Sequence, residues 1–144
     1  MSEIVVAASG YFDPLHVGHI EYLELAKKLG DKLIVIVNNS EQTKAKKGFE
    51  FMLFKERIKI MNSLKVVDEV FESIDEDSSV CESLAKIKPN IFAKGGDRNV
   101  GNIPEKEICE KYNIKIIDGL GEKIQASSEL IKNARENGHE TNID

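Results

Sequence analysis

Short runs of apolar, mostly β-branched residues alternate along this chain with longer segments whose apolar residues recur at helical spacing. The run 33–37, Leu-Ile-Val-Ile-Val, is apolar throughout, which is typical of a strand in a sheet covered on both faces. Further candidate strands lie at 4–8, 66–71, 90–93 and 114–117. The alternation predicts an α/β fold with a five-stranded parallel sheet and helices on both faces.

The segments between these runs carry the periodicity and the end signals of helices. We expect the last helix to begin at Ser127 or Ser128, after helices over 20–29, 53–64, 77–87 and 104–112. Asp77 and Ser78 are expected to cap the third helix, and Pro104 to open the fourth. Ligands of parallel sheets bind in the loops that follow strands, here 9–18, 38–52, 94–103 and 118–127.

Composition limits the class of protein. The 144 residues predict one domain over 1–136, followed by a polar tail over 137–144. A net charge of −5 argues against general binding to nucleic acid or to an anionic membrane. The apolar run near the N-terminus is too short for a signal core, so we expect a cytoplasmic protein. Cys81 and Cys109 lack the spacing of a zinc site and are expected to be idle thiols.

The loop after the first strand is the most distinctive stretch. It reads Gly-Tyr-Phe-Asp-Pro-Leu-His-Val-Gly-His over residues 10–19, and it contains neither of the familiar glycine-rich phosphate motifs. Gly10 permits a tight turn and the close approach of a ligand, and Gly18 leaves amides at the helix start open to an anion. His16 just before the helix and His19 in its first turn can aim both imidazoles at one point.

An anion is favoured at that point because it is the positive end of a helix dipole, and a phosphate is the natural candidate. Two alternatives stay open. The histidines can be structural residues that cap or pack, or they can bind a metal, although no third ligand is obvious.

Residues 10–19 resemble the H-x-G-H signature of the cytidylyltransferase-like nucleotidyltransferases, and the resemblance extends collinearly over residues 4–132. It implies a Rossmann-like sheet of order 3-2-1-4-5. It also implies transfer of a nucleoside monophosphate from a triphosphate to a phosphorylated acceptor, release of pyrophosphate, and a homodimer.

The resemblance also suggests roles for particular residues. Lys123 stands near the position of a family arginine, but an ammonium group cannot copy a guanidinium fork, and Ala126 departs from a family serine. Each of these residues also has an alternative role. The lysines of residues 44–47 can be a solvated surface, Arg57 can be an exposed helical charge, and the two serines can be helix caps. The catalytic candidates are His16, His19, Lys44 and Lys47, with Lys46, Arg57 and Lys123 as further possibilities. The expected nucleotide contacts are Gly10, Tyr11, Phe12, Asp13, Gly18, Gly95, Asp97, Arg98, Ser127 and Ser128.

The resulting hypothesis is direct in-line displacement, in which catalysis consists of positioning and charge stabilisation. Magnesium would bridge the phosphates with few protein ligands. CTP is placed ahead of ATP as the donor, with a phosphorylated polyol or sugar as the acceptor.

Other functions are kept as alternatives. The stretch Lys94-Gly95-Gly96-Asp97 resembles heptose-type enzymes, so an ATP-dependent sugar-1-phosphate adenylyltransferase is the first of them. A non-catalytic nucleotide sensor or scaffold is an alternative of another class. A nicotinamide-binding domain is disfavoured because the glycine fingerprint is missing.

Overall fold

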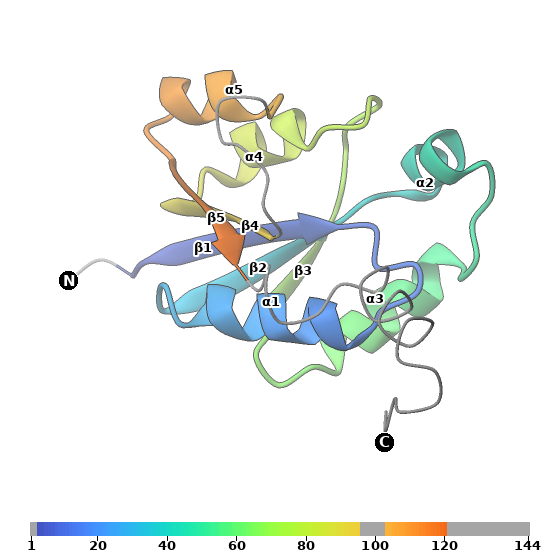
Figure 1. Ribbon diagram of the computed structural model, residues 1–144. Coiled ribbons are helices and arrows are strands. Elements are labelled where there is room, and N and C mark those ends of the chain that lie inside the picture. Colours follow the sequence, from blue (N-terminus) through green and yellow to red (C-terminus); the bar gives the residue numbers. More distant parts are fainter. Residues whose placement is uncertain (1–2, 96–102, 121–144) are drawn as a thin grey trace, which may run out of the picture.

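A computed structural model of the chain describes residues 3–95 and 103–120. Its strands form one five-stranded parallel sheet in the order β3-β2-β1-β4-β5 (Figure 1), which confirms the predicted class and strand order. All four neighbouring pairs are parallel. The strands are β1 (Val5–Gly10), β2 (Lys32–Val37), β3 (Glu69–Glu72), β4 (Ile91–Gly95) and β5 (Lys115–Leu120).

Helices cover both faces of the sheet, as expected. In Figure 1, α1 (Val17–Lys27) and α3 (Phe54–Asn62) lie on one face, and α4 (Cys81–Ile87) and α5 (Lys106–Lys111) lie on the other. The short α2 (Ser40–Lys47) stands beyond the carboxyl end of β2. None of the helices in the described ranges is long and apolar enough to cross a membrane. The expected last helix and the tail lie outside the described residues.

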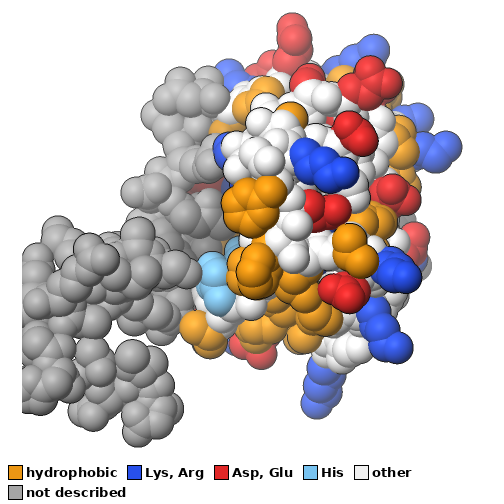
Figure 2. Space-filling view, turned by 90° about the vertical axis from the view of Figure 1, so that its right-hand side faces the viewer, with side chains coloured by type: hydrophobic (Ala, Val, Ile, Leu, Met, Phe, Trp, Pro, Cys, Tyr) orange, Lys and Arg blue, Asp and Glu red, His pale blue; other side chains and the backbone are white. Residues whose placement is uncertain are grey.

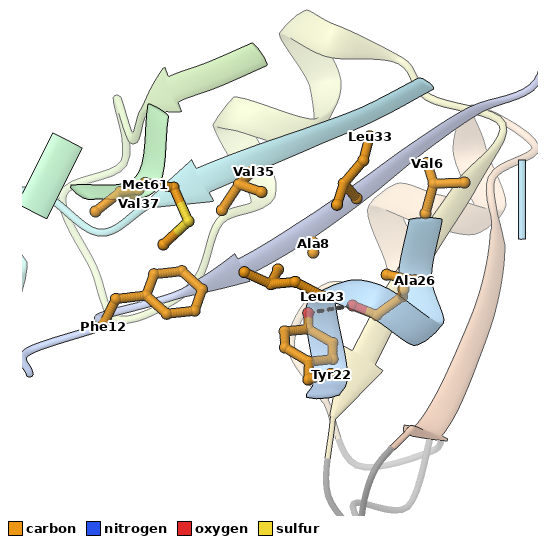
Figure 3. Packing of buried hydrophobic residues seen from close by; sticks show 11 residues of the cluster. Val6, Ala8, Phe12, Tyr22, Leu23, Ala26, Leu33, Val35, Val37 and Met61 are labelled. Carbon is orange, nitrogen blue, oxygen red and sulfur yellow. Dashed lines mark hydrogen bonds between the residues drawn. The ribbon is translucent and has the colours of Figure 1, made fainter. Parts of the chain in front are cut away.

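The apolar residues of β1 and β2 divide between two cores because successive side chains of a strand point to opposite faces. Val6 and Ala8 face α1 and α3, where they pack with Leu23 and Met61 in the cluster shown in Figure 3. Ala7 and Ile36 face α4 and α5, where they form the second cluster with Val80, Leu84, Phe92, Cys109 and Ile114. The helix that begins with the histidine motif, α1, packs against the first of these two cores.

Tyr22 joins the carboxyl ends of β1 and β4. Its hydroxyl donates to the carbonyl oxygen of Ala93 at 2.6 Å and accepts from the N–H of Ser9 at 3.1 Å. The first of these bonds is the dashed line at Tyr22 in Figure 3. Burial raises the pKa of this hydroxyl, so it stays protonated. A Cβ atom on Gly95 would lie 3.2 Å from the Tyr22 ring, so a larger residue at the end of β4 would require this ring to shift by a few tenths of an ångström. Tyr22 therefore fixes the edge of the sheet where the site lies.

The helix α2 corrects our expectation of a loop over residues 38–52. Its start is a capping box, in which Asn39 accepts from the N–H of Gln42 while the Gln42 side chain accepts from the N–H of Asn39. Gly48 ends it with a left-handed φ of 86°. Among its residues only Gln42 and Thr43 are buried, so α2 lacks the apolar stripe on which the prediction of helices relied.

The expected caps of α4 were wrong. Asp77 bonds to Ser79, which precedes the helix. The carboxylate of Asp75 accepts from the N–H groups of Glu82 and Ser83 in the first turn, at 2.7 and 2.9 Å. Asp75 therefore caps α4 although it lies further before the helix than the N-cap position at which sequence rules look for a capping residue.

Candidate functional site

The two histidines of the loop after β1 build the first turn of α1. His16 is the N-cap residue, and its Nδ1 accepts a hydrogen bond from the N–H of Gly18 at 3.1 Å. The Nδ1 of His19 accepts from the N–H of His16 at 3.1 Å. This reciprocal pair is a capping box in which imidazoles replace the usual hydroxyl and carboxylate groups. The predicted placement of His16 before the helix and His19 in its first turn is confirmed.

These bonds determine which nitrogen of each ring faces a ligand as a donor. Because each Nδ1 accepts a hydrogen bond, a neutral imidazole carries its proton on Nε2. Burial lowers the pKa of both histidines, and for His19 burial, His16 and Lys47 together lower it to about 4. The rings are stacked, with centroids 3.8 Å apart. At neutral pH the site therefore presents two adjacent, uncharged N–H donors.

The amide of Gly18 is not open to an anion, contrary to our expectation, because it donates to His16. The N–H of His19 donates to the carbonyl oxygen of His16 at 2.9 Å. The helix start therefore attracts an anion through its dipole and its imidazole donors rather than through the Gly18 amide.

Phe12 supports the histidines from the protein side. Its ring is 2% exposed and lies edge-on to His19, with ring centroids 5.1 Å apart. A Cβ atom on Gly10 would lie 2.8 Å from the Phe12 ring, so packing within the loop requires this glycine whether or not a ligand approaches. Phe12 was expected to contact the nucleotide, but its buried side chain leaves only its backbone for that role.

Asp13 ties the histidine loop to the segment that follows α2. Its side chain is buried, and its two carboxylate oxygens accept from the N–H groups of Phe51 and Met52 at 2.8 and 2.6 Å. Its carbonyl oxygen accepts from Nζ of Lys47 at 2.7 Å. The carboxylate expected to contact the nucleotide thus serves to anchor the loop.

The lysines of α2 differ in how closely they approach this loop. The Nζ atoms of Lys46 and Lys47 lie 5.9 and 5.8 Å from the centroid of the Tyr11 ring. Lys44 lies one turn earlier on α2 and is exposed to solvent. The structure therefore brings Lys46 and Lys47, rather than Lys44, against Tyr11, although Lys44 was predicted as catalytic and Lys46 only as a further possibility.

Arg57 is buried, so its interpretation as an exposed helical charge was wrong. Its guanidinium group donates to the carbonyl oxygens of Tyr11 and Asn38 at 2.9 Å each, and to that of Met52 at 3.2 Å. It also forms an ion pair with Glu50. All of these partners are protein groups from three loops at the carboxyl edge, so Arg57 holds the loops in place.

Glu50 is the residue of this network that sequence reasoning missed. Its carboxylate accepts from the guanidinium group of Arg57 and from the hydroxyl of Ser40, the first residue of α2, at 2.8 Å. A glutamate between two phenylalanines carries no local signal of burial, because the partners that bury it come from elsewhere in the chain.

Gly95 lies at the end of β4, where it was expected to approach a nucleotide, and it packs against Tyr22. Within residues 3–95 and 103–120, no group of three His, Cys, Asp or Glu side chains could hold a metal ion. Cys81 and Cys109 are free thiols whose pKa is raised by burial, so neither is a ready nucleophile. The other predicted contacts lie outside the described residues, namely Asp97, Arg98, Lys123, Ser127 and Ser128.

The parallel sheet, with imidazole donors and lysines at its carboxyl edge, defines an α/β protein of nucleotide-binding type. The family model described as "Cytidylyltransferase-like" matches residues 7–141, and the chain belongs to this family. The predicted resemblance is therefore confirmed.

Relatives of two kinds are similar to the chain. It is 43% identical over 103 residues to the bifunctional protein HldE of Blochmanniella floridana, which matches 70% of this chain and 21% of HldE. It is 40% identical over 114 residues to the FAD synthase of Thermococcus sibiricus, which matches 78% of this chain and 76% of that enzyme. The chain thus spans about a fifth of that HldE and about three quarters of the FAD synthase.

A solved structure agrees with the fold. The lipopolysaccharide core biosynthesis protein of Thermoplasma volcanium superposes with a TM-score of 0.69 at 32% identity, over 81% of this chain and 96% of that one. Pantoate-beta-alanine ligase of Francisella tularensis, solved in complex with beta-gamma ATP and beta-alanine, has a TM-score of 0.56 at 19% identity and shares the fold alone.

Proposed function

We propose that this chain transfers an adenylyl group from ATP to a small phosphate monoester and releases pyrophosphate. The observation that carries this proposal is the pair of neutral imidazoles at the start of α1, each with its Nδ1 bound to a backbone N–H. Such rings offer hydrogen bonds to phosphate oxygens without the cost of desolvating a buried cation.

In the proposed reaction, an oxygen of the acceptor phosphate attacks the α-phosphorus of ATP. The bond from this phosphorus to the bridging oxygen breaks, and pyrophosphate leaves. The acceptor phosphate is ionised at neutral pH, so the enzyme needs no nucleophile or general base of its own. The Nε2–H groups of His16 and His19 donate to oxygens that gain charge in the transition state. Lys47, held beside Asp13, and Lys46 neutralise the phosphates.

ATP is proposed in place of the CTP expected from sequence because several of the matched relatives are named FAD synthase, and FAD contains an adenylyl group. The described residues fit a magnesium ion held by the nucleotide itself, since both carboxylate oxygens of Asp13 already accept backbone hydrogen bonds. When bound, magnesium would offset the negative charge of the phosphates.

The test is a pyrophosphate-release assay with the purified full chain and magnesium. Each of ATP, CTP, GTP and UTP is combined with glycerol 3-phosphate, hexose and heptose 1-phosphates, and FMN, and products are identified by mass spectrometry. We expect turnover with ATP and one class of acceptor. Turnover with CTP alone would overturn the choice of nucleotide. Tight ATP binding without pyrophosphate release from any pair would overturn catalysis and favour the non-catalytic sensor.

A further inference from the structure

Phe12 has a backbone conformation that phenylalanine rarely adopts. Its φ is 52°, in the left-handed region, where the Cβ atom is crowded by a carbonyl oxygen. The residues on both sides of Phe12 are held by other parts of the chain. The carbonyl oxygen of Tyr11 accepts from Arg57, and the carboxylate of Asp13 accepts from two backbone N–H groups of the segment after α2. Strained residues that their surroundings fix in this way cluster at functional sites.

The strained backbone places the Phe12 ring in the core, behind the histidine motif. The ring belongs to the buried cluster of Figure 3, at the end of that cluster nearest Met61. Gly10 leaves the space that the ring needs, because a Cβ atom on Gly10 would lie 2.8 Å from it. An apolar residue of an unstrained strand can fill a core position equally well. The combination of a strained residue and a glycine therefore points to a more particular role for this ring.

That role is found in the contact between Phe12 and His19. The two rings meet edge to face, with centroids 5.1 Å apart and planes at 77°. His16 stacks on the same imidazole, with centroids 3.8 Å apart, and its N–H donates to Nδ1 of His19 at 3.1 Å. These three contacts restrict the rotation of the His19 imidazole. They leave Nε2 as the nitrogen that a ligand can reach.

The Phe12 ring also limits the access of water to His19. Figure 2 shows a histidine side chain at the molecular surface, where His16 is exposed, whereas His19 is half-buried. Burial is the main cause that lowers the pKa of His19. His16 at the start of α1 and Lys47 of α2 are the titratable groups that act on His19, and both lower its pKa further. An apolar ring on the protein side therefore favours the neutral imidazole.

We propose that Phe12 is a positioning residue for the reaction: its ring fixes the orientation of the His19 imidazole and shields it from water, so that Nε2–H donates to phosphate oxygens. The inference rests on the proposed function and adds a residue to its site. The buried ring acts through His19 and touches no substrate. If Phe12 only filled the core, its replacement would lower the stability of the fold and leave the properties of His19 unchanged.

The test is an NMR titration of the histidine rings in the full chain without nucleotide. The chain has three histidines, and His19→Gln identifies the signal of His19. The pKa of His19 should be about 4 in wild type, and Phe12→Leu should raise it toward 6.5, because water then reaches the imidazole. Phe92→Leu removes a buried ring from the second core. It is the matched control and should leave the pKa of His19 unchanged.

Gly10→Ala is a second variant that retains the Phe12 ring and displaces it. The added Cβ atom would lie 2.8 Å from the ring, so the ring must move. The pKa of His19 should therefore rise in Gly10→Ala as well. This variant carries the test if Phe12→Leu does not fold, which circular dichroism decides for each protein.

The pyrophosphate-release assay with ATP then tests the effect on the reaction. Phe12→Leu should lower kcat about tenfold and change the KM for ATP less than about twofold, because the His19 donor acts on charge that develops in the transition state. In a His19→Gln background, Phe12→Leu should lower kcat no further, because the residue through which Phe12 acts is already absent.

The outcomes separate this inference from the proposed function. An unchanged pKa of His19 in both Phe12→Leu and Gly10→Ala overturns the inference and makes Phe12 a core residue only. A fall in kcat that is equally large in the His19→Gln background also overturns it. If the pKa of His19 shifts as expected but wild type releases no pyrophosphate with any nucleotide, the proposed function is overturned, whereas the action of Phe12 on His19 is supported.

Discussion

Two loop clusters at the carboxyl edge of the sheet are each organised by one buried charged side chain. On the side of α3, Arg57 donates to carbonyl oxygens of three loops and pairs with Glu50. On the side of α4, Asp75 accepts from the N–H groups of Glu82 and Ser83 and from the hydroxyl of Ser83. Both charges are satisfied by the groups around them, which is the condition for burying them.

The two clusters differ in what they leave for a ligand. Around Asp75 the neighbouring polar groups bond to other protein groups. The Gln42 side chain, for example, donates to the carbonyl oxygens of Asp77 and Ser79. Around Arg57 the anchored loops present imidazole donors, lysines and large exposed apolar side chains outward. Similar anchoring therefore closes a helix end in one place and displays polar donors and lysines in another. The variants below test this division.

The largest effect is expected at Arg57. Arg57→Met removes hydrogen bonds to three loops and leaves Glu50 buried without its counter-ion, so the free energy of unfolding should fall by about 3–5 kcal/mol. Urea unfolding of the variant measures this change. Lys59→Met, an exposed change on the same helix, is the matched control and should cost less than about 0.5 kcal/mol. A loss at Arg57 no larger than at Lys59 would contradict its role as an anchor.

The second variant separates capping from chemistry at His16. Asn is a good N-cap residue, so His16→Asn can still accept from the N–H of Gly18 while it lacks the Nε2–H donor. Turnover in the pyrophosphate assay should fall about a hundredfold, with the free energy of unfolding changed by less than about 0.5 kcal/mol. If the variant keeps near-normal turnover, His16 is only a cap.

Asp75 should affect stability without affecting the reaction. Asp75→Ala leaves the N–H groups of Glu82 and Ser83 without their acceptor and should lower the free energy of unfolding by about 2 kcal/mol. Under conditions where the variant is folded, its KM and kcat should match those of wild type. Asp77→Ala removes an exposed carboxylate from the same loop and should cost less. A large drop in kcat for folded Asp75→Ala would contradict the prediction that the cluster around Asp75 affects only stability.

The smallest expected effect is the dependence of stability on pH. The pKa of His19 is about 4 in the folded protein and about 6.5 when unfolded, so the unfolded chain binds more protons between these values. The free energy of unfolding should therefore fall as the pH drops below about 6.5. At pH 5 the loss due to His19 should be about 1 kcal/mol after allowance for solvent screening. In His19→Gln the free energy of unfolding should lack this pH-dependent loss. Equal pH profiles of wild type and His19→Gln would contradict the contribution of His19.

Much of the fold follows from local patterns. The continuous apolar run of β2 and the shorter runs of the other strands predicted the sheet, because a strand buried on both faces needs apolar residues at successive positions. The helix α2 was missed because it has no apolar stripe. Its signals were the Asn39 and Gln42 capping box and the glycine at position 48, which together mark a helix of about the observed length.

The candidate site also has features that could be predicted from local sequence and features that could not. The capping box of His16 and His19 joins residues three apart, so their placement at the helix start could be predicted from spacing. The roles of Asp13 and Arg57 could not, because their partners are distant in sequence. Asp13 binds Phe51 across 38 residues, and Arg57 binds Tyr11 across 46.

The sequence by itself determined the alternation of strands and helices apart from α2, the placement of the two histidines at the start of α1 and the family, because these depend on neighbouring residues and on hydrophobic period. Tertiary structure alone decided which charged residues are buried as anchors and which side chains are left exposed around the histidines. The physical reason is that a charge can be buried only where distant backbone groups converge on it, and no local stretch of sequence records that convergence.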